Sequence, residues 1–269
     1  MTSHTDRRFA ITLARGLSVL GAFHPGDDGL ANSEIAQRTG LPKSTVSRLT
    51  FTLMRLGYLS HSGHRDRYRF GPALLALGNV ATGSIAFVHL AEPIMQKLAD
   101  ESRVLVVMAV RDRDRLLLTK TWRPFGISGI YLDVGHRLPI RGTASGHCLL
   151  TTLDDTQLEA IVKDVRRDPE FDLPAARRIR RDAILQMALR GYVAADPSDY
   201  FMPDIRAVAV PLVSEDMEQP VIFSCSFRAR DNAPGEIVDR VGPKLRQAVS
   251  HLDRIASGGP DPATGGQTD

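Results

Sequence analysis

The stretch that most constrains the fold of this chain covers residues 41–59, with the sequence LPKSTVSRLTFTLMRLGYL. Its apolar residues recur at steps of three and four, at Val46, Leu49, Leu53 and Leu56. This spacing predicts an α-helix with one apolar stripe. The first two turns of the outer edge carry only small hydrogen-bonding and cationic side chains, namely Lys43, Ser44, Thr45, Ser47 and Arg48. A helix that buries one face and exposes such an edge can enter the DNA major groove and contact base edges and phosphates.

The segment that precedes this helix predicts a second, shorter helix joined to it by a tight turn. In NSEIAQRTG we expect Asn32 to cap the helix, Ile35 and Ala36 to point inward, and Gly40 to end it. Two helices connected by a short Gly-Leu-Pro turn form a helix-turn-helix.

A hairpin-like stretch follows at residues 59–70, with Gly63 at the bend. Alternation along a strand places Arg65, Arg67 and Arg69 on one face and Tyr68 and Phe70 on the other. This pattern predicts the wing of a winged helix-turn-helix, with Arg65 and Arg67 on phosphate or in the minor groove. The alternative interpretation is an amphipathic helical hairpin whose basic face is merely solvated.

Length and charge agree with a DNA-binding protein of two domains. The chain has 269 residues, which suits two domains rather than one. Residues 1–84 contain ten Lys and Arg against five Asp and Glu, whereas the remainder contains 24 against 26. The positive excess therefore coincides with the predicted DNA-binding unit.

Several classes of protein are disfavoured. No run approaches the ~20 apolar residues of a membrane helix, and the N-terminus has no apolar segment typical of a secretory signal. Cys148 and Cys225, the only cysteines, lack the spacing of a disulfide scaffold or thiolate metal site. We therefore expect a cytoplasmic protein without a metal or cofactor.

The remaining pattern predicts an α+β chain with four parts. Residues 1–70 form the winged helix-turn-helix, opened by a helix over residues 11–23 whose Leu13, Leu17 and Leu20 pack on the other two helices. Residues 71–84 form a linker and dimerisation helix, with a bend at Gly83. Residues 85–257 form the second domain, and the Gly/Pro-rich residues 258–269 form a disordered tail.

Within the second domain the spacing of apolar residues alternates between that of a helix and that of a strand. We expect a helix over residues 85–102, kinked or restarted at Pro93. Strands are expected over residues 103–110, 116–122, 127–135, 192–195, 205–212 and 221–228. Helices are expected from Thr143, over residues 155–164 and 175–190, and over residues 235–255. Mixed strands and helices in this order are typical of an α+β sensor domain.

The segments TLARGLSVLGAF, LPKSTVSRL, YRFGPALLALG, VGHRLPIRGTASGHCLL, RGYVAAD and IRAVAVPL resemble, in order and spacing, the isocitrate lyase regulator (IclR) family of bacterial transcription factors. The resemblance covers nearly the whole chain. It implies a winged helix-turn-helix, a linker helix and a GAF-like effector domain with a six-stranded sheet flanked by helices. It also implies homodimers or dimers of dimers, a double-stranded DNA operator, and control by a small organic or aromatic acid.

The first turn of the helix beginning at TASG has unpaired N–H groups that attract an anion. The resemblance implies that Ala144, Ser145, Gly146, Asp196, Ser224 and Ser226 border the effector cavity. Ser224 and Ser226 alternate on one strand and so share a face. Arg141 would add a charge-assisted bond, Trp122 would form a wall, and Ile130 and Leu132 would line the site.

Each of these assignments has a structural alternative. Thr143 alone can cap the helix, Arg141 can be a surface residue or form an ion pair, and Trp122 can belong to the core. Ser224 and Ser226 can hydrogen-bond neighbouring backbone. The chain also departs from the usual family pattern at Arg141, His147 and Cys148, which favours a ligand with more negative charge than that of better-known members.

Two other functions compete with that of a ligand-responsive regulator. Ser145, His147 and Cys148 invite an acyl-transfer interpretation, but Ser145 and His147 point in different directions on a helix and no GxSxG turn is present. The chain is therefore not expected to be an enzyme. An architectural DNA-binding protein with a degenerate, ligand-free sensor domain is the other alternative.

Overall fold

The computed structural model describes residues 8–62, 66–84, 86–126, 130, 132–165, 168–195, 200–213, 219–229 and 236–258. The chain divides into two compact units, Met1–Ser84 and Ile85–Asp269, which we describe separately. Arg65, Asp196 and the predicted tail from residue 259 onward lie outside the described residues.

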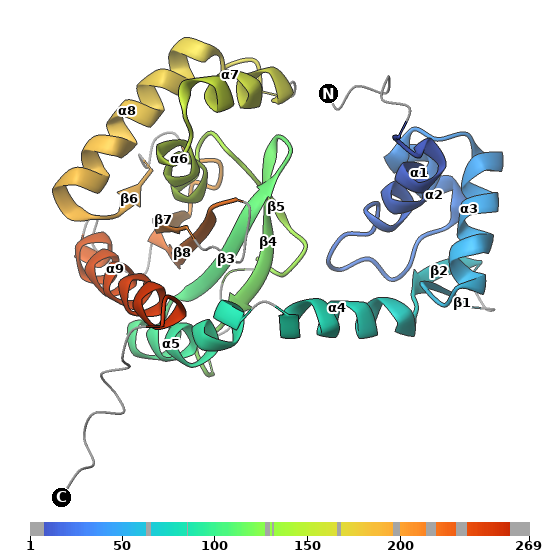
Figure 1. Ribbon diagram of the computed structural model, residues 1–269, viewed down its shortest axis with the longest axis horizontal. Coiled ribbons are helices and arrows are strands. Elements are labelled where there is room, and N and C mark those ends of the chain that lie inside the picture. The colour runs from blue at the N-terminus through green and yellow to red at the C-terminus, as the bar shows by residue number, and fades with distance from the viewer. Residues whose placement is uncertain are drawn as a thin grey trace, which may run out of the picture. The chain divides into compact units, whose positions relative to one another are not determined.

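The first unit contains the predicted helix-turn-helix and wing (Figure 1). Its elements are α1 (Ile11–Leu20), α2 (Asn32–Thr39), α3 (Lys43–Arg55), β1 (Leu59–Ser62), β2 (Arg67–Phe70) and α4 (Pro72–Ser84). The two strands pair antiparallel, with Leu59 opposite Phe70. Its core consists of the fully or nearly fully buried side chains of Val19, Ala22, Leu30, Ile35, Ala36, Val46, Leu59 and Tyr68. The helix-turn-helix and its wing are therefore confirmed as structural elements.

The ends of α2 differ in part from the prediction. Gly40 ends the helix with a positive φ of 69°, a backbone conformation that glycine adopts without strain. The N-cap is Ala31 rather than Asn32, and the Glu34 carboxylate accepts the Ala31 N–H at 2.8 Å. Asn32 is instead the first helical residue, and its side-chain oxygen accepts a hydrogen bond from Thr50 at 3.0 Å.

The predicted apolar stripe of α1 does not face the core of this chain. Leu13 and Leu17 are 64% and 58% exposed, whereas Val19 is fully buried. The error arises because one amphipathic helix can carry two apolar faces, and periodicity does not say which of them its own domain covers. Leu56 is likewise exposed, because α3 ends at Arg55.

The second unit is built around a six-stranded antiparallel sheet (Figure 1). Its elements are α5 (Ala86–Ser102), β3 (Leu105–Asp112), β4 (Arg115–Trp122), β5 (Arg137–Pro139), α6 (Ala144–Thr151), α7 (Asp155–Asp164), α8 (Leu173–Arg190), β6 (Val193–Ala194), β7 (Ile205–Leu212), β8 (Val221–Arg228) and α9 (Glu236–Ala256). The strand order is β5-β4-β3-β8-β7-β6. The α+β class is thereby confirmed.

Both faces of this sheet are buried, and each has its own hydrophobic cluster. Helices α5 and α9 cover one face, while α6, α7 and α8 lie on the other (Figure 1). Val106 belongs to the α5 and α9 cluster, and the neighbouring Val107 belongs to the α6 cluster. Because side chains alternate along a strand, consecutive residues lie on opposite faces of the sheet.

Local predictions for this unit differ in part from the structure. Of the predicted strand over residues 127–135, residues 130 and 132–135 form no strand, and residues 127–129 and 131 lie outside the described residues. The outer strand beside β4 is β5, where no strand was predicted. The prediction failed because β5 has only three residues and contains a proline, so it has no visible period. Helix α5 continues through Pro93, so it does not restart there, one of the two outcomes predicted at this proline.

No single helix in the described part of the chain is long and apolar enough to cross a membrane. The stretch that has sufficient length and apolar composition is divided between two helices, α4 and α5.

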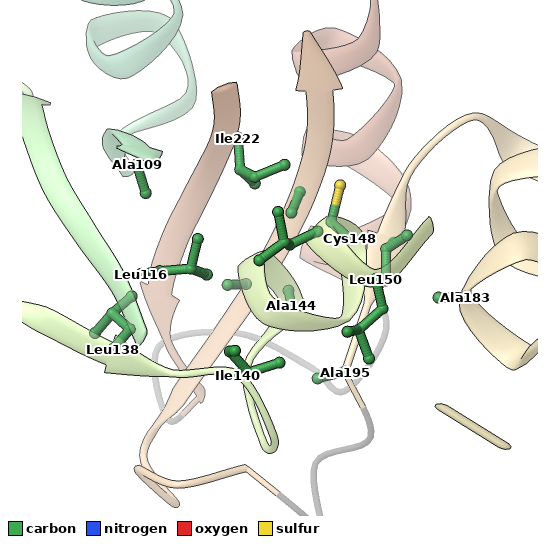
Figure 2. Packing of buried hydrophobic residues seen from close by; sticks show 14 of the residues in the cluster. Ala109, Leu116, Leu138, Ile140, Ala144, Cys148, Leu150, Ala183, Ala195 and Ile222 are labelled. Atoms are coloured by element: carbon green, nitrogen blue, oxygen red, sulfur yellow. The ribbon is translucent and has the colours of Figure 1, made fainter. Parts of the chain in front are cut away.

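Helix α6 sits very close to the segment that leads into it (Figure 2). A Cβ added at Gly146 would lie 2.0 Å from the carbonyl oxygen of Ile140, far below van der Waals contact. Ile140, Ala144 and Cys148 pack together in the cluster above the sheet. Glycine at position 146 is therefore required for this close approach.

We predict that Gly146→Ala lowers the free energy of unfolding of the second unit by about 3 kcal/mol, because backbone atoms must move to relieve the overlap. Urea unfolding followed by the fluorescence of Trp122, the only tryptophan, measures this change. Gly78→Ala is the matched control, since nothing lies within 4 Å of a Cβ at that helical position. Equal unfolding midpoints for the two variants would contradict the packing argument.

Candidate DNA-binding face and acid-binding site

Helix α3 divides cleanly into a buried face and an exposed edge. Val46 and Thr50 are fully buried in the first unit, and they fix which way the helix faces. Four of the predicted DNA contacts are exposed and the fifth, Thr45, is partly buried; the exposed four are Lys43, Ser44, Ser47 and Arg48. No acidic residue lies in the first turn of this helix. The edge therefore presents hydroxyl and cationic groups without a competing carboxylate on its own first turn.

A partly buried hydrogen bond between α2 and α3 holds this edge in place. The Thr50 hydroxyl donates to the side-chain oxygen of Asn32 at 3.0 Å. Thr50 also contacts the carbonyl oxygen of Val46 at 3.0 Å, so its hydroxyl lies between the two helices. Sequence analysis missed this pair, because a threonine on the inner face of a helix resembles an ordinary core residue.

The wing arginine Arg67 is committed to contacts within its own unit. Its side chain donates to the carbonyl oxygen of Gly29 at 3.1 Å and to the carboxylate of Glu34 at 3.0 Å. The Ala31 N–H, followed by the charge of Arg67, holds the pKa of Glu34 below its usual value. Arg67 therefore ties the wing to the start of α2, and a phosphate contact would have to compete with Glu34.

In the second unit, the first turn of α6 is partly capped by its own chain. The Thr143 side-chain oxygen accepts the N–H of Gly146 at 2.9 Å, and its hydroxyl donates to the carbonyl oxygen of Pro139 at 2.7 Å. Gly146 thus has two structural roles, as a capped donor and as the site of close approach. The Ala144 N–H is directed at the Tyr200 hydroxyl, so it is not free for another acceptor.

The predicted serines meet beneath α6. Ser145 donates to the Ser224 hydroxyl at 2.9 Å across the gap between helix and sheet, and both residues are buried. Ser226 is buried on the same sheet face, two residues along β8. Ile130 and Leu132 belong to the same cluster as Ala144. The structure therefore brings together Ala144, Ser145, Ser224 and Ser226, with the two aliphatic residues nearby.

Trp122 does not join this group. It is buried in the cluster of α5 and α9, where its ring lies 6.2 Å from that of Phe223. Phe223 precedes Ser224 on β8, so the tryptophan packs on the opposite face of the sheet from the serines. The prediction that Trp122 forms a wall of the acid site is wrong, because its strand position points it into the other layer.

Arg141 forms the ion pair that was the alternative interpretation. Its guanidinium donates to Asp168 at 2.7 Å and contacts the carboxylate of Glu170 at 2.7 Å. It lines a surface pocket of about 520 Å³ beside α8, together with His147 and Asp182. Two carboxylates thus compensate its charge, and an anion at the start of α6 would have to compete with them for this guanidinium.

Sequence analysis missed Tyr200. This residue is buried in the α6 cluster, and the backbone N–H of Ala144 donates to its hydroxyl. The segment is held by the Phe201 N–H, which donates to the carbonyl oxygen of Gly142 at 3.0 Å. A tyrosine in a polar loop between two strands carries no periodic signal, so only the fold reveals its position.

The same residues argue against nucleophilic catalysis. Ser145 donates to Ser224, while the ring of His147 accepts the N–H of Gly142 at 3.3 Å, so these two residues do not pair. Burial raises the pKa of both cysteine thiols, which keeps them protonated. Among the described residues, no group of three or more His, Cys, Asp or Glu is placed to hold a metal ion.

Comparison with known proteins assigns both units. Residues 12–63 match the family model described as the IclR helix-turn-helix domain, and residues 80–254 match that of the bacterial transcriptional regulator IclR C-terminal domain. The Pca regulon regulatory protein of Pseudomonas putida is 28% identical over 92% of this chain and 84% of its own length. These matched proteins are regulators of transcription, not enzymes.

Solved structures agree with the fold. An IclR family transcriptional regulator from Brucella abortus is 32% identical, with a TM-score of 0.76 over 97% of this chain and 96% of that one. An IclR homolog from Microbacterium hydrocarbonoxydans, complexed with 4-hydroxybenzoate, is 24% identical, with a TM-score of 0.72 over 92% of this chain and 99% of that one. The second likeness concerns the fold alone.

Proposed function

Because this chain belongs to the IclR family of bacterial transcriptional regulators, we propose that it binds operator DNA through the edge of α3 and is controlled by a small organic or aromatic acid bound beneath α6. In this proposal the regulated genes form a catabolic operon. Binding of the acid changes how paired chains set the spacing of two α3 helices. Such linkage between sites is reciprocal, with a typical coupling of ~1–3 kcal/mol.

The observation that carries the DNA half of the proposal is the exposed edge of α3. Arg48 is exposed and forms no ion pair within the described residues, so its guanidinium is available for a base edge or a phosphate. Lys43, Ser44 and Ser47 extend the same edge toward the helix start. Thr50 and Val46 anchor the opposite face, which keeps the edge turned outward.

The acid half is supported by the buried hydroxyls of Ser145, Ser224 and Ser226 and by the helix start above them. A helix N-terminus favours an anion through its free N–H groups and its dipole. Ile130 and Leu132 add apolar surface suited to a hydrocarbon or aromatic ring. The relative of the same fold that carries 4-hydroxybenzoate makes an aromatic acid a natural first probe.

Exposed apolar side chains in the first unit support a homodimer. Leu13 and Leu17 lie one turn apart on α1, and Leu77 and Val80 lie on one face of α4; all four are more than half exposed. Clusters of this kind mark interaction surfaces. A second copy of the chain would cover them and would place two α3 helices on successive half-sites.

We predict that Arg48→Ala weakens binding to a duplex selected from a random pool by ~1–3 kcal/mol if Arg48 contacts a base. Fluorescence anisotropy on selected and unrelated duplexes distinguishes this role from a phosphate contact, which would weaken both equally. Arg55→Ala, at the far end of the same helix, is the matched control. Unchanged binding by Arg48→Ala would remove this residue from the DNA-binding face.

For the acid site, a thermal-shift panel of 4-hydroxybenzoate, benzoate and pyruvate is the direct test. A ligand at about 100 times its Kd adds ~2.7 kcal/mol to the stability of the state that binds it. We expect at least one acid to raise the Tm of the wild-type chain and to lose this effect in Ser224→Ala. Ser102→Ala, which removes another buried hydroxyl, should respond like wild type. A flat response across the panel would favour a ligand-free sensor domain.

The dimer is tested by Val80→Glu, which places a carboxylate in the exposed apolar face of α4. Burying that charge between two chains is unfavourable, so we expect the dimer dissociation constant to rise at least about tenfold. Light scattering during gel filtration measures the change, with Asn79→Glu as the control at an exposed polar position. A dimer that survives Val80→Glu at all concentrations would place the interface elsewhere.

A further inference from the structure

We propose that Arg123 is a positioning residue that joins the wall of the acid site to α5, the helix that follows the linker α4. Its guanidinium holds the wall segment, defined as the segment that carries Ile130 and Leu132, while its own carbonyl oxygen is held by α5. This inference rests on the proposed function, and it identifies contacts through which acid binding reaches the linker.

The guanidinium of Arg123 holds the wall segment by its backbone. It donates to the carbonyl oxygens of Ile130 and Leu132, each at 2.8 Å, and to the carboxylate of Asp133 at 2.6 Å. The side chains of Ile130 and Leu132 are buried in the cluster that contains Ala144, where the acid is proposed to bind. A planar guanidinium bonds two oxygens at once and so fixes its position relative to both. A displacement of the wall segment would therefore move the Arg123 side chain.

The backbone around Arg123 is held by one face of α5 (Figure 1). The side-chain amide of Gln96 donates to the carbonyl oxygen of Arg123 at 2.8 Å, and the carboxylate of Asp100 accepts the N–H of Phe125 at 2.8 Å. Gln96 also donates to Asp100 at 3.2 Å, so these contacts form one connected group. Arg123 is thus the residue at which side-chain contacts to the wall segment and backbone contacts to α5 meet.

A further contact extends this attachment along β4. The ammonium group of Lys120 lies 2.6 Å from the carboxylate of Glu92 on α5. Glu92, Gln96 and Asp100 recur at steps of four residues, so they lie on one stripe of the helix. Polar contacts at three successive turns therefore bind α5 to the end of β4 and to the residues that follow it. We expect α5 and this end of the strand to shift together.

Helix α5 is joined directly to the helix that sets the spacing of paired DNA-binding units in the proposed function. One residue separates the end of α4 at Ser84 from the start of α5 at Ala86. In this proposal the acid displaces the wall segment, Arg123 follows because it holds two carbonyl oxygens there, and Gln96 conveys the shift to α5. Close-packed interiors transmit such displacements. The start of α5 then differs between the acid-bound and the acid-free chain.

The same contacts would stabilise the second unit even if they conveyed nothing. The two roles differ in one measurable quantity, the linkage factor, defined as the ratio of the duplex Kd values with and without saturating acid. A purely stabilising role leaves this ratio unchanged in a variant that is folded. Loss of the connection brings the ratio toward 1, although the chain still binds the acid and the duplex separately.

The test compares the linkage factor of the full-length wild-type chain with that of Gln96→Met, which keeps the length of the side chain and removes its amide. The probes are the selected duplex, followed by fluorescence anisotropy, and 4-hydroxybenzoate, or benzoate or pyruvate if either gives the larger thermal shift. We expect Gln96→Met to bring the linkage factor about 2- to 10-fold closer to 1, the effect of one lost hydrogen bond. Its Kd for the acid, by calorimetry, and its Kd for the duplex without acid should match those of wild type.

Two sets of variants on α5 control for nonspecific effects. Lys97→Met introduces the same side chain at the next position, where the lost contact is an exposed ion pair with Glu101, and its linkage factor should match wild type. Asp100→Asn keeps an oxygen that can accept the Phe125 N–H, so it should retain the linkage factor. Asp100→Ala removes that acceptor and should lower the linkage factor as Gln96→Met does.

Arg123→Lys tests the other end of the connection. Lysine keeps the positive charge but lacks the planar group that bonds two carbonyl oxygens, so the linkage factor should fall. Because this variant also releases the wall segment, it should bind the acid more weakly, unlike Gln96→Met. Arg177→Lys changes an arginine on α8 that pairs with Glu159 at 3.3 Å, and it should behave like wild type.

The inference is overturned if Gln96→Met, Asp100→Ala and Arg123→Lys keep the wild-type linkage factor. An equal fall in Lys97→Met also overturns it, since any change on α5 would then suffice. Duplex binding without acid shows that a variant is folded, and a variant that loses it is replaced by the other two. If the wild-type chain binds no acid, or binds it without a change in duplex affinity, the proposed function fails and this inference fails with it. An unchanged linkage factor confined to the variants leaves the proposed function intact.

Discussion

The burial of both faces of the six-stranded sheet is the constraint on which the second unit depends. With α5 and α9 on one side and α6 to α8 on the other, every strand residue must suit one of two apolar layers. Consecutive residues on β8 show the consequence: Phe223 packs toward Trp122, while Ser224 turns toward Ser145. The hydroxyls of Ser224 and Ser226 lie within a layer that is otherwise mainly apolar. These buried polar groups support the acid site proposed there.

In the first unit, burial of one face of α3 leaves the opposite edge of this helix exposed. Val46 and Thr50 hold α3 from within, and the hydrogen bond from Thr50 to Asn32 fixes it against α2. The cationic edge is thereby oriented by the core rather than by its own charges. The wing is fixed differently, because Arg67 reaches Gly29 and Glu34. Arg67, one of the two arginines predicted to contact phosphate, thus also holds the wing to its own unit.

The sequence predicted elements correctly where apolar residues recur regularly over a whole element or where a residue such as glycine marks the end of a helix. It placed α7 and the strands β7 and β8 at their observed bounds, and it placed the end of α2 at Gly40. It failed where tertiary context decides the outcome. The side of the sheet that Trp122 faces depends on the register of β4, which composition does not reveal. The commitment of Arg141 to Asp168 and Glu170 depends on a loop 27 residues away.

The proposed acid site is therefore only half predictable from the sequence. Ser145, Ser224 and Ser226 follow from a helix start and a strand period, and the family resemblance supported them. Tyr200 has neither kind of signal, because it lies in a loop that only the fold brings into the α6 cluster. The same holds for charge: Arg141 was predicted to bind an anion, but Asp168 and Glu170 compensate its charge in the folded chain.

The central claim is that acid bound beneath α6 and DNA bound at α3 are linked through one protein. The most direct measurement is the Kd of the full-length chain for its selected duplex, by fluorescence anisotropy, with and without a saturating acid. The account predicts a change of about 5- to 150-fold. A duplex affinity that stays constant while calorimetry shows the acid site to be filled would contradict it.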